Sequence, residues 1–303
     1  PAPATGLRRA DPWQRPPMRT VLAALWTVLA LFVALAVLLY VAGTRPSAPA
    51  TAPGQPTAPS QRLLVVEVNL AKADFPAGWK VDASATGPLT GLLAAGAGTG
   101  AAPVQALTPA DSRQEARVGR QFSRCLGIAP AKDRVFGKAG AGPVARGSSP
   151  AFEAPAGGPP LEGGSVTAVY RSGVPVSAAM AQVLEPRFAD CFGRAVASQV
   201  RAASAASAAG AAGVGVGAAT TYGTPTAHPL ALAHHAGVRA AGVDLDFPVT
   251  VGGSVTGVQL GFVFVGGGRV ASTLVTFGTS TGFPATLTSR LTQAVERRVA
   301  AHQ

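Results

Sequence analysis

The most apolar stretch of the chain lies near its start, where residues 20–43 carry no charged side chain and are mainly Leu, Val and Ala. A helix rises about 1.5 Å per residue, so this run is long enough to cross the ~30 Å hydrocarbon core of a bilayer. Arg15 and Arg19 precede the run, and basic residues favour the cytoplasmic side of a membrane. The pattern predicts a single transmembrane helix at 20–43, a basic cytoplasmic tail at 1–19 and an extracytoplasmic remainder.

The alternative to an anchor is a cleaved signal peptide, with Val41-Ala42-Gly43 as its cleavage site. Apolar regions of signal peptides span about 7–15 residues, which is shorter than this run, so an uncleaved anchor fits better. Residues 44–61 are rich in Pro, Ala and Thr, and segments of that composition are extended and semi-rigid. We expect them to form a linker that holds one outer domain, residues 62–303, away from the bilayer.

Five segments of this outer domain have the composition or the alternation of β-strands. In the strand expected at Val243–Val251, Leu245, Phe247 and Val249 share one face. Pro248 lacks the N–H that a central strand donates, which predicts an edge strand there. Three glycines at 266–268 predict a tight hairpin turn. The expected strands are Arg62–Leu70, Gly164–Arg171, Val243–Val251, Val255–Val265 and Arg269–Phe277.

Three further segments have helical periodicity. The first begins at Thr108-Pro109, a cap followed by a proline at the first helical position, and ends before Gly127. The second runs from near Pro186 toward residue 203, and the third covers residues 286–299. Strands and helices without strict β-α-β alternation indicate an α+β domain, in which an antiparallel sheet is covered by helices.

Two segments near 84–107 and 202–241 are of low complexity, rich in Ala and Gly, and are expected to be loops. Between the first strand and the first of these loops, residues 74–79 read Asp-Phe-Pro-Ala-Gly-Trp, which predicts a turn that carries two large aromatic side chains.

The two cysteines of the chain both lie on the apolar faces of expected helices. Cys125 shares its face with Val118 and Phe122, and Cys191 lies on the second helical face. The apolar face expected for the second helix consists of Leu184, Phe188, Cys191, Phe192 and Ala195. An extracytoplasmic domain is in an oxidising compartment, so two inward-facing cysteines predict a Cys125–Cys191 disulfide.

The surroundings of the two cysteines are alike, with Phe-Ser-Arg-Cys-Leu-Gly at 122–127 and Phe-Ala-Asp-Cys-Phe-Gly at 188–193. Gly-Gly-Ser-Val-Thr also occurs twice, at 163–167 and at 252–256. The order of the two words is the same in both halves. This indicates either an ancient duplication or chance recurrence in a Gly-rich chain.

The formal net charge is +11, and a strongly basic chain can bind nucleic acid. The predicted topology argues against that partner, because most of the charge faces away from the cell's nucleic acid. Four arginines fall within about 60° of one another on the polar face of the first helix, namely Arg113, Arg117, Arg120 and Arg124. This row is either an ordinary solvated helix face or a surface that binds anionic envelope polymers.

Residues suited to catalysis or metal binding are few. The histidines His228, His234 and His235 lie in an expected loop, and no carboxylate follows them until Asp244. Asp244 and Asp246 share one strand face and could act as a carboxylate pair, although solvated strand faces are commonly charged. We therefore expect no catalytic constellation, no enzyme activity, no metal and no cofactor.

The anchor, the linker, the turn at 74–79, the two helical cysteines and the C-terminal hairpin and helix together resemble actinobacterial membrane-anchored secreted domains. Those domains are similar to the PsbP-like fold and to the extracellular sensor domains of actinobacterial serine/threonine kinases. The resemblance implies an α+β domain for ligand binding or sensing and implies no catalytic residue.

The sequence as a whole predicts a single-pass membrane protein with an extracytoplasmic binding or sensory domain. Its expected partners are the lipid bilayer, through residues 20–43, and an anionic envelope polymer or another envelope protein. Its working surface would be a cleft between the sheet and its helices, aided by the arginine row. The alternatives are a structural or assembly accessory of envelope proteins and, third, an extracytoplasmic hydrolase.

Overall fold

A computed structural model describes residues 59–82, 89–90, 93, 109–135, 142–198, 220–230, 232, 237–251, 254–279 and 282–303. The predicted tail, the predicted anchor at 20–43 and most of the predicted linker lie outside these ranges. Among the helices within them, none has both the length and the apolarity needed to span a bilayer.

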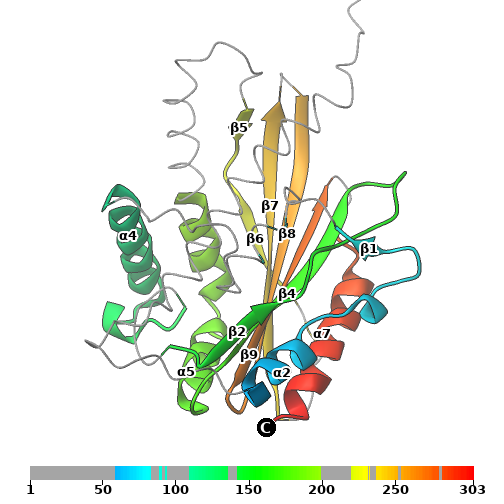
Figure 1. The fold of residues 1–303 in the computed structure, drawn as a ribbon. Helices are drawn as coiled ribbons and strands as arrows, with labels where there is room; N and C mark the ends of the chain where they lie inside the picture. The colour runs from blue at the N-terminus through cyan, green and yellow to red at the C-terminus, as the bar shows by residue number, and fades with distance from the viewer. Residues whose placement is uncertain are drawn as a thin grey trace, which may run out of the picture.

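The domain is built on one antiparallel nine-stranded sheet, in the order β1-β3-β4-β9-β8-β7-β5, with β2 paired to β4 and β6 paired to β7 (Figure 1). Helices cover both faces of this sheet, so the predicted α+β class is confirmed. The strands are β1 (Lys80–Val81), β2 (Ala145–Ser148), β3 (Phe152–Glu153), β4 (Leu161–Val169), β5 (Thr220–Tyr222), β6 (Thr226–Leu230), β7 (Arg239–Val251), β8 (Ser254–Gly267) and β9 (Val270–Thr279).

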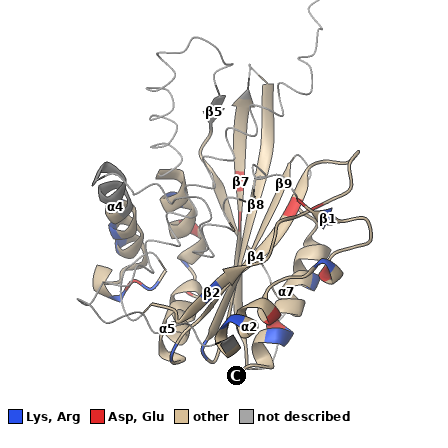
Figure 2. Ribbon diagram, in the orientation of Figure 1, with Lys and Arg blue, Asp and Glu red and all other residues tan. Residues whose placement is uncertain are grey.

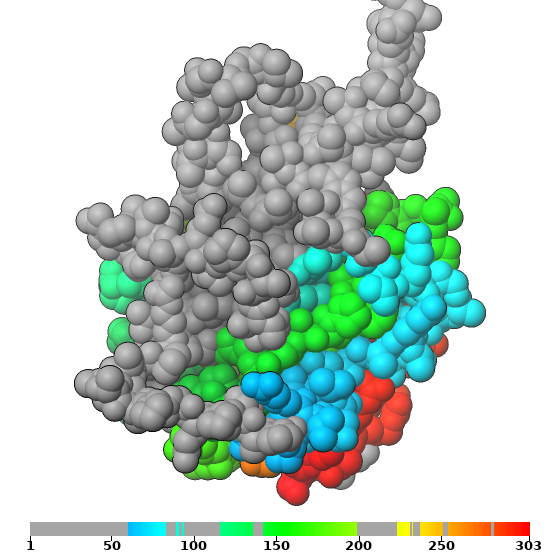
Figure 3. All heavy atoms as spheres, viewed as in Figure 1, coloured from blue at the N-terminus to red at the C-terminus, as the bar shows by residue number. Residues whose placement is uncertain are grey.

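The helices form two groups, one on each face of the sheet (Figure 1). On one face lie α2 (Pro59–Val68) and α7 (Ala285–Ala300), side by side in Figure 3. On the other face lie α4 (Pro109–Leu126), α5 (Val174–Val183) and a helix of residues 188–198. Two short 3-10 turns, η1 (Lys72–Asp74) and η2 (Pro130–Lys132), follow α2 and α4.

Each face of the sheet has its own apolar core, because successive side chains of a strand point to opposite faces. In β4, for example, Val166 belongs to the core under α4 and Val169 to the core under α2 and α7. The first core includes Phe122, Phe188, Phe192, Leu245, Phe247 and Phe277. The second includes Leu64, Val65, Val68, Phe75, Trp79, Leu274, Leu291 and Val295.

The strongest periodic patterns gave correct elements. Helix α7 buries Leu287, Leu291, Val295 and Val299, as the helical pattern over 286–299 predicts. Strands β8 and β9 form the predicted hairpin, and Gly268 in its turn has φ +49. The turn at 74–79 is also confirmed, since the rings of Phe75 and Trp79 stack with centroids 4.9 Å apart.

The strand predicted at Arg62–Leu70 is wrong, because this segment is helix α2. The buried residues Leu64, Val65 and Val68 follow the spacing of a helix face, whereas Leu63 and Val66 are exposed. A short run of apolar residues fits both periods, and the composition alone favoured the strand.

The edge strand predicted from Pro248 is also wrong, because β7 pairs with β8 on one side and with β5 and β6 on the other. The amide N–H of Gly223 donates to the carbonyl of Pro248 (2.8 Å). In a strand the N–H and the C=O of one residue point to the same side. The missing N–H of Pro248 therefore faces the break between β5 and β6, where no ladder bond is lost.

The expected loop at 202–241 is interrupted by β5, β6 and the start of β7, so this expectation is wrong at those strands. In the expected loop at 84–107, Leu89 and Leu93 are buried in the core under α4. The other residues of that segment, apart from Thr90, lie outside the described part of the chain.

Helix α5 was not predicted, and the helix after it begins at residue 188 rather than near Pro186. The segment that begins at 188 follows α5 closely, and Leu184 caps α5 through its amide. Leu184 is consequently 43% exposed, although the sequence placed it on a buried face. Phe188, Cys191, Phe192 and Ala195 are buried as predicted.

The repeated words at 122–127 and 188–193 have different local structures. Gly127 ends α4 with φ +74. Gly193 lies inside its helix, where an added Cβ would come within 2.7 Å of the Ala227 methyl group. The two glycines thus serve different purposes, which favours chance recurrence of these short words.

Candidate functional site

Helix α4 carries the predicted arginine row, and its ends and inner face fix how that row is presented. Val118 and Phe122 are buried on the inner face, at 0% and 1% exposure. At the C-terminus, the amides of Gly127 and Ile128 donate to the carbonyls of Arg124 and Ser123. This is the Schellman motif, and a glycine at positive φ is its usual residue.

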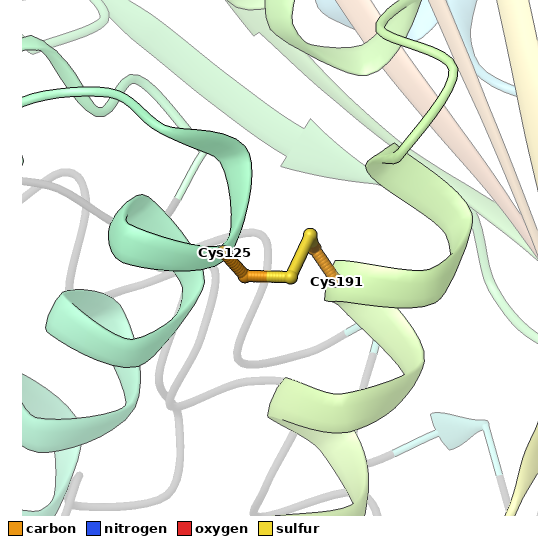
Figure 4. Close-up of a disulfide and its surroundings, with 2 residues drawn as sticks. All are labelled: Cys125 and Cys191. Atoms are coloured by element: carbon orange, nitrogen blue, oxygen red, sulfur yellow. A yellow bond between two sulfur atoms is a disulfide. The ribbon is translucent and has the colours of Figure 1, made fainter.

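The Cys125–Cys191 disulfide joins α4 to the helix of residues 188–198 (Figure 4). The sulfur atoms are 2.04 Å apart and the Cα atoms 5.6 Å apart, so the predicted cross-link is present. The rings of Phe122 and Phe188 meet edge to face nearby, with centroids 5.8 Å apart. The same two helices are also joined by a hydrogen bond in which the hydroxyl of Ser198 donates to the side chain of Gln121 (3.3 Å).

The arginine row lies on the outer face of α4 (Figure 2). Arg117, Arg120 and Arg124 are exposed, and within the described residues none of the three takes part in an ion pair. Arg113 lies in the same helix, but its side chain is outside the described part. At 1.5 Å per residue, the three described arginines span about 10 Å along the helix.

The segment linked to α4 by the disulfide adds both signs of charge. Arg187 and Arg194 are exposed there, and so are Glu185 and Asp190. From residue 116 to its end, where the side chains of α4 are described, the helix carries three exposed charged residues, Arg117, Arg120 and Arg124, and all three are basic. Guanidinium groups are permanent cations with five donors each, so such a row can bind carboxylate or phosphate groups.

A second polar cluster lies on the face of β6 and β7 that α7 leaves open. His228 is opposite Asp244 in the strand register, and its Nε2 lies 3.4 Å from Oδ2 of Asp246. Burial, and next the charge of Asp246, raise the pKa of Asp244 to about 6, while His228 acts in the opposite direction. The sequence placed the aspartates on one face correctly but left His228 in a loop.

Metal binding by these residues has no support in the part of the chain that is described. No group of three His, Cys, Asp or Glu side chains there could hold a metal ion. His234 and His235 lie outside the described residues, so the histidine cluster considered from the sequence is not tested.

Glu162 was not predicted from the sequence as a candidate functional residue. It lies in β4, facing the core under α4, and is 5% exposed. Its Oε2 accepts a hydrogen bond from the amide of Leu89 (3.0 Å). Burial raises its pKa to about 8, against the lowering effect of that hydrogen bond and with smaller raising contributions from Asp82 and Glu153. The strand predicted from the sequence began at Gly164 and so excluded Glu162, and no local pattern indicated that this carboxylate is buried.

The space between the sheet and its helices is filled, among the described residues, by the side chains of the two apolar cores. The outer face of α4 is the candidate working surface, because its described side chains expose three arginines. No model of a known protein family matches the chain, and comparisons with curated proteins and with solved structures find no match. The resemblance to PsbP-like and kinase sensor domains stays a prediction from short sequence words.

Proposed function

We propose that the chain is a single-pass membrane protein whose extracytoplasmic domain binds anionic polymers of the cell envelope without catalysis. The binding surface is the outer face of α4, with Arg117, Arg120 and Arg124 at its centre. The observation that supports this most is that all three arginines are exposed, follow one another at intervals of three and four residues, and have no ion-pair partner among the described residues.

The attachment of α4 supports the same proposal. Binding costs less conformational entropy when the groups that bind are already held in place. The disulfide and the Phe122–Phe188 contact hold α4 against the neighbouring helix at two adjacent points. A disulfide also suits an extracytoplasmic location, because the cytosol keeps cysteines reduced.

The polymer is expected to be a repeating polyphosphate or polycarboxylate rather than a single small anion. The outer two arginines of the row, Arg117 and Arg124, are about 10 Å apart along the helix, more than the ~8 Å Debye length at physiological salt, so one small ion cannot interact strongly with the whole row. A polymer presents several anions to the row at once, so its binding should be multivalent and should weaken steeply with salt.

The test is binding of the full chain, in detergent or in bilayer discs, to poly(glycerol phosphate) and to poly(glutamate) at several salt concentrations. The double variant Arg117→Glu/Arg120→Glu should weaken binding by more than about tenfold at low salt and reduce the salt dependence. Each variant should keep its helical circular dichroism and its disulfide, because both positions are exposed.

The matched control is Arg297→Glu, which changes an exposed helical arginine on the opposite face of the sheet. It should change binding by less than about twofold, since its charge lies away from α4 and is screened. Equal weakening by Arg120→Glu and Arg297→Glu would show that only net charge matters. Unchanged binding by the double variant would dismiss α4 as the surface.

A further inference from the structure

One end of the domain brings together segments that are far apart in the sequence. The amide of Tyr170 donates to the carbonyl of Arg269 (2.9 Å), which places the start of α5 beside the β8–β9 turn. An added Cβ on Gly173 would come within 2.7 Å of the carbonyl oxygen of Gly268. The side chain of Gln303 donates to the carbonyl of Gly237 (2.7 Å), so the start of β7 lies at the same end.

Helix α2 begins at this end as well. His302 Nε2 lies 3.3 Å from Oε2 of Glu67, which joins the last turn of α2 to the last residues of the chain. Arg62 precedes Glu67 by five residues, about 7.5 Å along a helix. Figure 1 shows the first residues of α2 near the position marked C, together with the β8–β9 turn and the start of α5.

We call this region the tether end and define it by six exposed residues, four basic and two apolar: Arg62, Arg171, Arg239, Arg269, Leu63 and Val174. Leu63 is 61% exposed and Val174 is 72% exposed, so both apolar side chains are accessible to a partner. The exposed carboxylate of α2, that of Glu67, lies 3.3 Å from His302 Nε2. Figure 2 shows basic positions recurring along this end.

We propose that the tether end rests on the bilayer surface, with its four arginines on anionic lipid headgroups and with Leu63 and Val174 at the boundary of the acyl chains. Basic residues combined with exposed apolar side chains are the composition by which protein surfaces bind the membrane interface. This proposal rests on the proposed function, because it takes residues 20–43 to be the membrane anchor.

The tether selects the bilayer over other anionic partners. Helix α2 begins at Pro59, and the 15 residues from 44 to 58 connect it to the predicted anchor. Fully extended, 15 residues reach at most about 50 Å, so the bilayer is always within reach of the tether end. Short tethers give effective concentrations in the millimolar range, so weak contacts with lipid suffice for docking.

Docking in this pose leaves the proposed ligand surface accessible. Helix α4 lies on the face of the sheet opposite α2, and its arginine row is not part of the tether end (Figure 1). The two basic surfaces would then have different partners: the tether end binds lipid, and the row on α4 faces the envelope polymer.

The test uses the full chain in vesicles, with Ser172→Cys as a labelling site between Arg171 and Gly173. The native cysteines form the disulfide, so an added thiol is labelled selectively. A fluorophore there should be quenched by headgroup quenchers in vesicles with phosphatidylglycerol and much less in pure phosphatidylcholine. Each basic residue near an anionic surface contributes about fivefold to association. Arg62→Glu/Arg269→Glu should therefore lower the docked-to-free ratio at least about 25-fold.

The control variant Arg117→Glu/Arg120→Glu should leave this quenching unchanged. Equal quenching in both lipids would overturn the docking proposal. Equal quenching of the wild type and of Arg62→Glu/Arg269→Glu would overturn it as well. Quenching that rises with protein density at fixed lipid composition would overturn it in favour of contact between two copies of the chain.

Alkaline extraction of the same vesicles separates the two proposals. A chain that stays in the membrane but shows no lipid-dependent quenching has the anchor without the docking. A chain that is extracted lacks the anchor, which would contradict the proposed function before docking is tested.

Discussion

The two faces of the sheet attach their helices by different means. On the face of α4 the contacts are aromatic and covalent: Phe122 meets Phe188 (5.8 Å between centroids), Phe192 meets Phe262 (5.3 Å), and Cys125 joins Cys191. On the face of α2 and α7 a buried hydrogen-bond network does this work. There the side-chain oxygen of Asn69 accepts from the hydroxyls of Ser165 (3.0 Å) and Thr167 (2.8 Å).

The difference follows from the lengths and surroundings of the helices. Helix α2 has only 10 residues, too few for independent stability, so its geometry depends on what holds its ends. Asn69 follows its last turn, and Arg298 of α7 donates to the carbonyl of Asn69 and to the carboxylate of Asp74, both at 2.8 Å. Helix α4 has 18 residues and an amphipathic face, and its position relative to its neighbour is set by the disulfide. The comparison teaches that polar contacts fix the short helix and a covalent bond fixes the outer one.

The largest expected effect is the loss of the disulfide. Cys125 and Cys191 are 66 residues apart, and removing a cross-link over such a loop costs about 4 kcal/mol by the loss of chain-entropy restriction. The variant Cys125→Ser/Cys191→Ser should lower the free energy of unfolding by about that amount in urea titration. Reduction of the wild-type protein should give the same midpoint. A loss below about 1 kcal/mol would show that the aromatic contacts alone hold α4.

The second effect is on the opposite face. Replacing Asn69 with Leu removes the acceptor of two buried hydroxyls and should cost about 3 kcal/mol, because each buried donor left unpaired costs roughly 1–3 kcal/mol. Ser272→Ala is the matched control. It removes a hydroxyl 3.0 Å from that of Thr167 but leaves Thr167 bonded to Asn69, so about 1 kcal/mol is expected. Equal losses in the two variants would mean that cavity formation, not hydrogen bonding, dominates this face.

The third effect concerns pH and again involves the face of α4. Glu162 has a pKa of about 8 in the folded protein against 4.5 as its ordinary value. Between these two pH values the folded state holds a proton that the unfolded chain releases, so stability falls as pH rises. From pH 5 to pH 7 the contribution of this group is a loss of about 2 kcal/mol.

Glu162→Gln keeps an acceptor for the Leu89 amide and cannot ionise. Denaturant unfolding at a series of pH values should therefore show a smaller decline with rising pH in this variant than in the wild type. Glu185→Gln serves as the control, since this carboxylate is exposed and is not among the groups that shift the pKa of Glu162. Parallel pH profiles for wild type and Glu162→Gln would contradict the assignment.

These two faces also show what a sequence of this kind reveals. Helices α4 and α7, the β8–β9 hairpin and the disulfide were predictable because each depends on a pattern within one element or on two cysteines in known surroundings. The run at 62–70 was misassigned because Leu, Leu, Val and Val in succession satisfy a helix face and a strand equally. The polar contacts that hold the end of this helix come from Ser165 in β4, about 95 residues away, which accepts from the Leu70 amide and donates to Asn69.

The candidate sites also differ in whether a local sequence pattern can predict them. The arginine row on α4 follows from helical spacing, so the sequence located it. The pairing of His228 with Asp246 and the burial of Glu162 under Leu89 depend on strand register and on long-range packing. The tether end combines the starts of α2, α5 and β7 with a hairpin turn, and no local pattern brings these four together.

The smallest expected effects distinguish Gly127 from Gly193, the two glycines that end the similar sequences at 122–127 and 188–193. Gly127 has φ +74 and no atom within 4 Å of an added Cβ, so Gly127→Ala should cost about 1 kcal/mol through backbone strain alone. No second-site substitution should recover that loss. Gly193 has no such constraint, but its added Cβ would meet Ala227 at 2.7 Å and Leu245 at 3.6 Å.

Gly193→Ala should therefore cost a similar amount for a steric reason, and Ala227→Gly should recover most of it in the double variant. The measurement is a double-mutant cycle of unfolding free energies for positions 193 and 227, with Gly127→Ala combined with Ala227→Gly as the additive control. Non-additive unfolding free energies for positions 193 and 227, with additive ones for 127 and 227, would confirm the two different roles. Gly193 is then required for a close contact with β6, and Gly127 for its backbone conformation. Additivity in both cycles would instead mean that β6 moves aside freely, and that the contact between this strand and helix 188–198 does not constrain the domain.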